Sequence, residues 1–143
     1  MSSKSLLDTD MMSELLKGKN AVVAARSRDY LREHHRITLA SLSVTEVVAG
    51  YRQALRTVQL ESFRRAIGAT EVLSFGVAEA ELAGLIIGDL ARSGQLIGAI
   101  DPLIAAVAIT NGLVLVTGNQ RHFERIRLLG FDLRLDNWRE PVL

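Results

Sequence analysis

The chain has 143 residues, of which 48% are hydrophobic and 23% charged, and this predicts one globular domain over residues 1–143. It contains no cysteine, which excludes disulfides and thiolate metal sites and suits a reducing cytoplasm. The formal net charge of +1 indicates neither a nucleic-acid binder nor an acid-binding surface, although 14 of the 17 basic residues are arginine, whose guanidinium suits phosphate oxygens.

Hydrophobic runs in this sequence are short. The longest, over residues 103–109, is far below the roughly 18 residues that a membrane span requires, so we expect no association with a membrane. Asp8 also comes too early for the apolar region of a signal peptide. We therefore expect an intracellular, cytoplasmic protein.

The first elements are a strand, an acidic turn and a helix. Leu6 and Leu7 suit a buried strand, Asp8 and Asp10 follow it, and apolar residues then recur at helical spacing until Gly18. In an open α/β sheet such a turn lies at the carboxyl ends of the strands, where ligands and catalytic groups collect.

The middle of the chain continues this alternation. The patterns predict helices over residues 21–34, 60–67 and 78–91, and strands over 37–42 and 72–75. Ser43 and Glu46 have the spacing of a capping box at the start of a further helix, which gives Glu46 a structural role. Gly84 and Gly88 would allow another helix to approach closely, and we expect that helix within the same subunit.

The last third begins with a loop over residues 95–100. Asp101 is a suitable N-cap and Pro102 a suitable first residue for the buried helix that follows. A buried strand is predicted over 113–117, a helix capped by Asn119 over 120–127, and an edge strand over 131–135. The whole pattern predicts a three-layer α/β domain, with a mainly parallel central sheet flanked by helices.

Four residues with side-chain oxygens lie at predicted helix starts: Asp8, Glu46, Asp101 and Asn119. In a parallel sheet the turns from strand to helix open on one edge, so these oxygens are expected to converge. Clustered carboxylates repel one another unless a cation neutralises them. Oxygen ligands without cysteine favour a hard ion, Mg²⁺ or Mn²⁺.

Four segments in order along the chain resemble the motifs of PIN domains, in the branch of VapC-type toxins. They run from Leu6 to Asp10, Ser43 to Gly50, Ile97 to Ala106 and Leu115 to Phe123. The resemblance implies a metal-dependent endoribonuclease that cuts single-stranded or loop RNA, leaving 5′-phosphate and 3′-hydroxyl ends. It also implies a homodimer and inhibition by a VapB-type antitoxin.

The same resemblance implies roles for particular residues. Asp8, Glu46 and Asp101 would be catalytic residues that bind the metal, Mg²⁺ or Mn²⁺, and Asn119 would hold the fourth catalytic position. Asp10 and Thr117 would support the site by hydrogen bonds. The sequence departs from the family at two positions: Asn119 stands where aspartate is common, and Gly118 where a larger residue, often arginine, is common.

Other functions were weighed against this one. A haloacid-dehalogenase-type phosphatase or a phosphoacceptor receiver domain needs a lysine in the second half of the chain, but the lysines are residues 4, 17 and 19. The three histidines, His34, His35 and His122, are interpreted as surface or packing residues. A PIN fold that has lost catalysis and serves as an RNA or protein interaction domain, and an RNA-processing nuclease that is not a toxin, remain alternatives.

Overall fold

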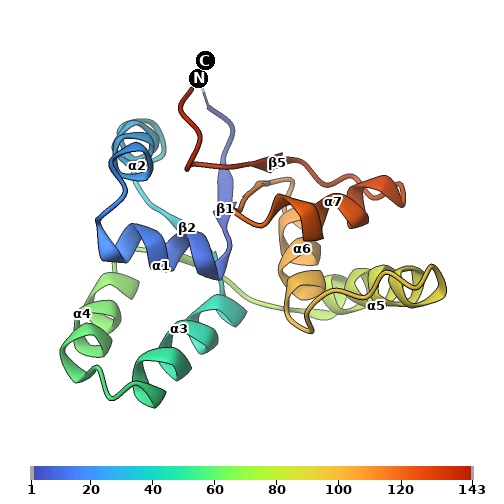
Figure 1. Cartoon of the computed structure of the whole chain (residues 1–143), viewed down its shortest axis with the longest axis horizontal. Helices are drawn as coiled ribbons and strands as arrows, with labels where there is room; N and C mark the ends of the chain where they lie inside the picture. Colours follow the sequence, from blue (N-terminus) through green and yellow to red (C-terminus); the bar gives the residue numbers. More distant parts are fainter. Residues whose placement is uncertain (1, 143) are drawn as a thin grey trace.

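The computed structural model describes residues 2–142, and its centre is a five-stranded sheet in the order β3-β2-β1-β4-β5 (Figure 1). All paired strands are parallel. The strands are β1 (Ser5–Leu7), β2 (Thr38–Ala40), β3 (Glu71–Leu73), β4 (Val114–Val116) and β5 (Leu135–Asp136). The predicted α/β class with a parallel sheet is therefore confirmed; of the predicted domain 1–143, Met1 and Leu143 lie outside the described residues.

Helices cover both faces of the sheet. They are α1 (Thr9–Lys17), α2 (Ala21–His34), α3 (Ser41–Gln53), α4 (Thr57–Ile67), α5 (Val77–Arg92), α6 (Asp101–Thr110) and α7 (Gln120–Leu128). In Figure 1, α1 to α4 lie on one side of β1, and α5 to α7 lie on the other. This arrangement confirms the three layers.

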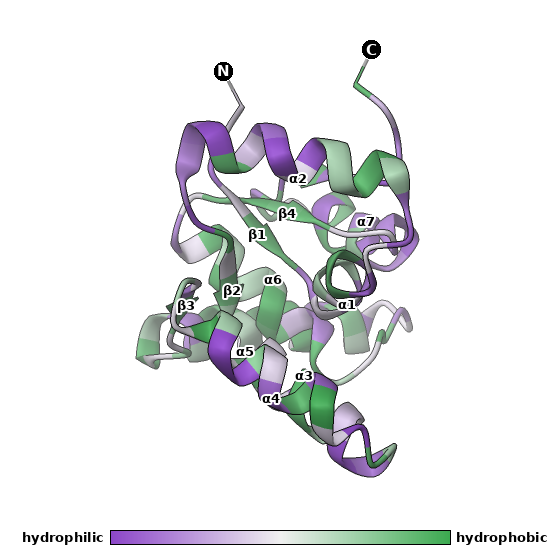
Figure 2. Ribbon diagram, turned by 90° about the vertical axis from the view of Figure 1, so that its left-hand side faces the viewer, coloured by the Kyte–Doolittle hydropathy of each residue, from purple (hydrophilic) through white to green (hydrophobic). Residues whose placement is uncertain are grey.

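The side chains of each strand point alternately to the two faces of the sheet, so the hydrophobic core has two parts. Leu6 pairs in register with Leu115, and both point into the core shared with α5, α6 and α7. Leu7 pairs with Val116 and with Leu39, and these three point into the core shared with α1 to α4. Successive residues of a strand face opposite sides, so one short apolar strand supplies both cores. Figure 2 shows hydrophobic residues along β1 and β4 and mostly polar residues along α2.

The predicted capping box is wrong. Strand β2 ends at Ala40, helix α3 begins at Ser41, and Ala40 is the N-cap. Ser43 is therefore the third residue of the helix and fully buried, so it caps nothing. Glu46 is left free for a contact outside its own helix.

Two other expected boundaries differ in the structure. Asp101 is the first residue of α6 and Ile100 is the N-cap, so Asp101 does not cap this helix with its side chain. The last strand is Leu135–Asp136 rather than 131–135, because the Leu133 amide bonds to the Phe131 carbonyl in a turn and Leu133 packs into the core.

The two glycines of α5 do not receive a neighbouring helix within the subunit. Gly84 and Gly88 are exposed, and no atom lies within 4 Å of a Cβ built on either. The expectation of an intramolecular close approach is wrong, and this face of α5 points outward.

Residues 2–142 include no helix that combines the length and the apolar character needed to cross a membrane.

Candidate active site

The carboxyl ends of β1 and β4 form the centre of the site. The Asp8 amide donates a hydrogen bond of 3.0 Å to the Val116 carbonyl, which continues the pairing of Leu7 with Val116. Asp8 and Thr117, each the first residue after its strand, therefore lie beside one another. Both are buried, although both are polar.

Asp8 is held rigidly. Its Oδ1 accepts a 2.7 Å hydrogen bond from the Met11 amide and caps helix α1, as the sequence indicates, and the Thr117 side chain also bonds to the carboxylate. The pKa of Asp8 is raised to about 6, mainly by burial and also by the charges of Asp10 and Asp101, while the hydrogen bonds oppose the rise. A buried carboxyl among like charges is thus fixed in one orientation.

Asp101 approaches from the other side of the sheet edge. Burial raises its pKa and the charge of Asp10 adds to the effect, whereas the His122 side chain lowers it. The Nδ1 atom of His122 lies 3.5 Å from Asp101 Oδ2 and 2.8 Å from Asn119 Nδ2. One Nδ1 atom cannot accept a hydrogen bond from the Asn119 amide and donate one to Asp101 at the same time, so the shorter contact with Asn119 is the hydrogen bond when His122 is neutral.

Asn119 is the N-cap of α7, but its side chain makes no capping hydrogen bond. It turns to His122 instead, one helical turn further on. The structure therefore joins Asn119, His122 and Asp101 into one chain of polar contacts.

Glu46 reaches the site through Thr9. The Thr9 hydroxyl donates a hydrogen bond to Glu46 Oε1 and lies 3.0 Å from the Ser43 hydroxyl. Thr9 follows Asp8 directly, so helix α3 brings Glu46 to the same edge of the sheet. The contact spans 37 residues of sequence.

Asp10 lies on the exposed side of α1. The resemblance gave it a supporting role through hydrogen bonds, but within residues 2–142 no hydrogen bond joins its carboxylate to another site residue. Its influence is electrostatic, because its negative charge raises the pKa of both Asp8 and Asp101.

The donor set fits a hard divalent ion only in part. Asp8 and Asp101 are carboxylates whose raised pKa values reflect burial and like charge, both of which a bound cation offsets. Within the described chain, however, no three His, Asp or Glu side chains are arranged as a metal site. Glu46 is bonded to Thr9, so it joins such a site only by leaving that hydroxyl.

Two residues near the site escaped the sequence reasoning. His122 was interpreted as a surface or packing residue, yet it contacts Asp101 and Asn119; the signal was its spacing of one helical turn from Asn119. Arg139, in the C-terminal tail, places its guanidinium against Gly118. No local pattern predicts that contact.

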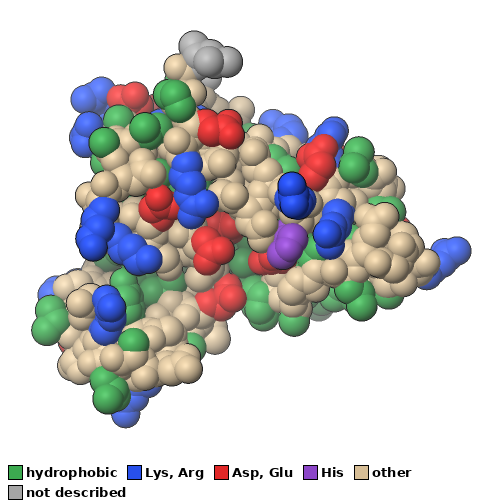
Figure 3. Space-filling model, viewed as in Figure 1, with side chains coloured by type: hydrophobic (Ala, Val, Ile, Leu, Met, Phe, Trp, Pro, Cys, Tyr) green, Lys and Arg blue, Asp and Glu red, His purple; other side chains and the backbone are tan. Residues whose placement is uncertain are grey.

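On this face of the molecule, basic side chains surround a group of acidic ones. Figure 3 shows acidic side chains in the middle of the face, a histidine beside them, and Lys and Arg side chains around them. This distribution suits a polyanion whose phosphates contact the rim while one of them reaches the acidic centre.

Comparison with known proteins agrees with the fold. The sequence profile of the PIN domain family matches residues 5–129. The chain therefore belongs to the PIN domain family.

Relatives of this chain cover nearly its whole length. It is 31% identical over 139 residues to the tRNA(fMet)-specific endonuclease VapC of Salmonella typhimurium, with 94% of this chain and 98% of the relative covered. It is 28% identical to ribonuclease VapC2 of Haemophilus influenzae at the same coverage. Its structure matches a chain of DNA-bound VapBC from Salmonella typhimurium with a TM-score of 0.82 at 30% identity, over 96% of this chain and 99% of that one.

Proposed function

We propose that this protein is an endoribonuclease toxin of the VapC type that hydrolyses phosphodiester bonds in RNA. The observation that carries the proposal is the Asp8 carboxylate at the carboxyl edge of the sheet, whose pKa is raised by burial and, to a smaller extent, by the charges of Asp10 and Asp101. Membership of the PIN domain family and the ribonuclease names of its relatives support the reaction class.

The proposed substrate is a single-stranded or loop segment of tRNA, with tRNA(fMet) as the first RNA to test. Support comes from the relative of 31% identity, which is named for that tRNA. Sequence-specific recognition of RNA favours unstacked bases of loops, since the deep major groove of an RNA duplex cannot be read by side chains.

The proposed cofactor is Mg²⁺ or Mn²⁺, held by Asp8 and Asp101 and joined by Glu46 once it leaves Thr9. When bound, such an ion supplies Lewis-acid stabilisation of the charge that develops on the phosphate. The chain's own residues orient these groups: Met11 and Thr117 fix Asp8, while His122 lies against Asp101.

Asn119 has a different task in this proposal. It is neutral, so it adds a carbonyl oxygen or an amide donor to the site without a further negative charge. Its hydrogen bond with His122 holds the imidazole beside Asp101. The negatively charged ligands in this proposal are therefore Asp8, which follows β1, Glu46 on α3 and Asp101 on α6.

A VapB-type antitoxin is the proposed partner. Solved relatives are VapBC complexes, and the one at 30% identity matches this chain over almost its whole length. We also propose a homodimer formed through the outward face of α5. On this helix Val77 is 80% exposed and Leu85 is 63% exposed, beside the uncovered Gly84 and Gly88.

The dimer is tested by light scattering during size-exclusion chromatography. Leu85→Asp places a charge in the centre of the proposed interface and is expected to give the mass of a monomer. Leu128→Asp, which changes a residue that is 73% exposed on α7, is the control and should leave the mass unchanged. A wild-type protein with the mass of a monomer would contradict the dimer.

The catalytic proposal is tested by incubating the purified chain with tRNA(fMet) in Mg²⁺, in Mn²⁺ and in chelator. The wild type should cut only with metal, and Asp101→Asn should lose at least about 100-fold in rate, the size of effect seen when one group that stabilises developing charge is removed. Asp132→Asn, at an exposed position on the loop before β5, is the matched control and should cut normally.

Two outcomes favour the alternatives. A wild type that binds RNA but cuts none with either metal is an interaction domain that has lost catalysis. A wild type that cuts RNA but neither arrests growth when expressed nor responds to a small protein encoded beside it is an RNA-processing nuclease rather than a toxin.

A further inference from the structure

The C-terminal tail brings an arginine to the position where residue 118 lacks a side chain. A Cβ atom built on Gly118 would overlap the Nη1 and Cζ atoms of Arg139. Gly118 separates Thr117, which bonds to Asp8, from Asn119, which bonds to His122. The guanidinium of Arg139 therefore lies directly above the turn that follows β4.

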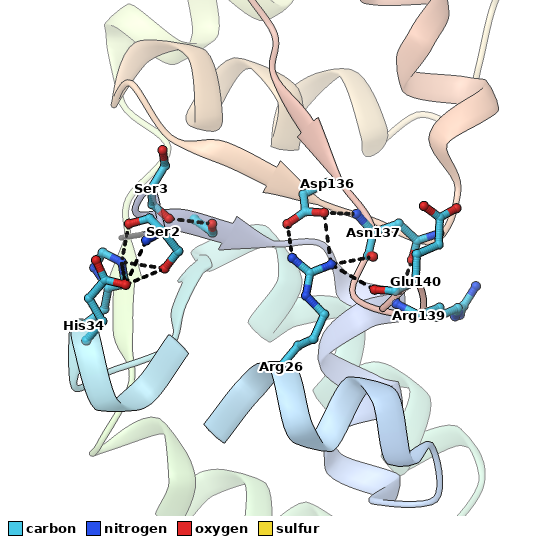
Figure 4. A network of polar contacts seen from close by, with 10 residues as sticks. Ser2, Ser3, Arg26, His34, Asp136, Asn137, Arg139 and Glu140 are labelled. Atoms are coloured by element: carbon cyan, nitrogen blue, oxygen red, sulfur yellow. Dashed lines mark hydrogen bonds and ion pairs between the residues drawn. The ribbon is translucent and has the colours of Figure 1, made fainter. Parts of the chain in front are cut away.

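The tail that carries Arg139 is firmly anchored. Arg26 on α2 donates hydrogen bonds to both carboxylate oxygens of Asp136, at 3.2 and 2.7 Å, and to the carbonyls of Asn137 and Glu140, at 2.9 and 3.1 Å. Figure 4 shows this network, with the Arg139 side chain extending away from the Arg26–Asp136 pair. Residues on both sides of Arg139 are thus fixed, and its side chain points elsewhere.

Arg139 lines a hollow that borders the site at Asp10. The lining includes Asp10, Glu14, Lys17 and Lys19. The Nε atom of Arg139 donates to Glu14, yet the side chain remains 43% exposed, and in the described chain its Nη groups donate no hydrogen bond. The four N–H donors of its two Nη groups are therefore available to a ligand in the hollow.

We propose that Arg139 binds a phosphate of the RNA next to the one that is cut and thereby positions the substrate; this inference rests on the proposed ribonuclease function. The argument is electrostatic. Asp8, Asp10 and Asp101 repel RNA, so productive binding needs a cation that meets the neighbouring phosphate at the rim. A guanidinium matches phosphate geometry with two parallel hydrogen bonds. Gly118 leaves the space in which this group lies.

The test measures RNA binding separately from cleavage. Binding of fluorescein-labelled tRNA(fMet) is measured by anisotropy at several KCl concentrations in an Asp101→Asn background, in which cleavage is expected to be at least about 100-fold slower. Arg139→Gln should weaken binding about 10-fold and reduce the slope of log K against log[salt] by about 1, as expected for one lost phosphate contact. Gly118→Ala, which keeps the arginine but displaces it, should act in the same direction.

Control variants separate phosphate binding from a purely structural role. Glu14→Gln removes the charged partner of Arg139 but leaves the positive charge of Arg139 in place, so the salt slope should stay unchanged. If Arg139 only clamps the tail, Glu14→Gln and Arg139→Gln should have the same effect on RNA binding. Arg32→Gln alters an exposed ion pair with Asp29 near the end of α2, which leads to the amino edge of the sheet, and should have no effect. The double variant Gly118→Arg with Arg139→Gln returns a guanidinium to the same space and should restore the slope.

The failures of the two proposals can be told apart. If the wild type cuts tRNA and Arg139→Gln keeps the wild-type salt slope, the role of Arg139 is overturned and the ribonuclease function stands. If the wild type cuts no RNA but the slope falls by about 1, the ribonuclease proposal fails and the phosphate contact stands. Lack of RNA binding by the Asp101→Asn protein at every salt concentration overturns the role of Arg139.

Discussion

Replacing Asp8 by asparagine should stabilise the protein at neutral pH while it abolishes the proposed activity. The pKa of Asp8 is about 6 in the folded protein against an ordinary value of 3.8, so the folded state holds this proton more tightly than the unfolded state does. The stabilisation that the Asp8 proton gives to the folded state is greatest at low pH, falls as the pH rises from about 4 to about 6, and does not change further above that. At about 1.36 kcal/mol per pKa unit, the loss is about 3 kcal/mol at pH 8.

The asparagine carries no titrating proton and still caps α1. The difference in free energy of unfolding between Asp8→Asn and wild type should therefore widen by about 2 kcal/mol between pH 4.5 and pH 8, which follows from the two pKa values. Urea denaturation in chelator measures it at each pH, and taking the difference between the two proteins cancels the titrating groups that do not interact with Asp8. Parallel pH profiles for the two proteins would refute the reasoning, because they would mean that the Asp8 pKa is unshifted.

Further predictions concern the core, the tail and the second carboxylate. Leu6→Ala should lower the free energy of unfolding by about 2–5 kcal/mol, since Leu6 is fully buried, while Leu55→Ala at an 80% exposed position should change it by less than about 0.5 kcal/mol; urea denaturation compares them. Arg26→Met should lower the free energy of unfolding by about 1–3 kcal/mol and speed amide hydrogen exchange in residues 136–140. Unchanged exchange in these residues would contradict the anchoring role of Arg26. His122→Leu should raise the pKa of Asp101, followed by carbon-13 NMR of the carboxyl groups, because His122 lowers it; a fall would be inconsistent with that contact.

Much of the fold follows from local patterns. The apolar pair Leu6–Leu7 before Asp8 predicts a buried strand that leads into a helix, and the structure has β1, the Asp8 cap and α1 in that order. The buried strand β4 and the Gly18 stop of α1 also lie where the sequence places them. These features depend on residues that are close in sequence, so their patterns are sufficient.

The surroundings of the site could not be predicted in the same way. A capping box explained Glu46 locally, but α3 begins three residues earlier than that pattern requires, and Glu46 instead meets Thr9 across 37 residues. The contact of Arg139 with Glu14 spans 125 residues. Such pairings depend on how the helices pack around the sheet, and spacing along the chain carries no signal of them.

The central claim is that the carboxylates at the carboxyl edge of the sheet form one site for a divalent ion. Calorimetric titration of Mn²⁺ into the purified wild type, Asp8→Asn, Asp101→Asn and the exposed control Asp132→Asn tests it most directly. The account predicts binding by the wild type and by Asp132→Asn, with a large loss of affinity in the other two variants. Equal affinity in all four proteins, or no binding by the wild type at millimolar Mn²⁺, would contradict it.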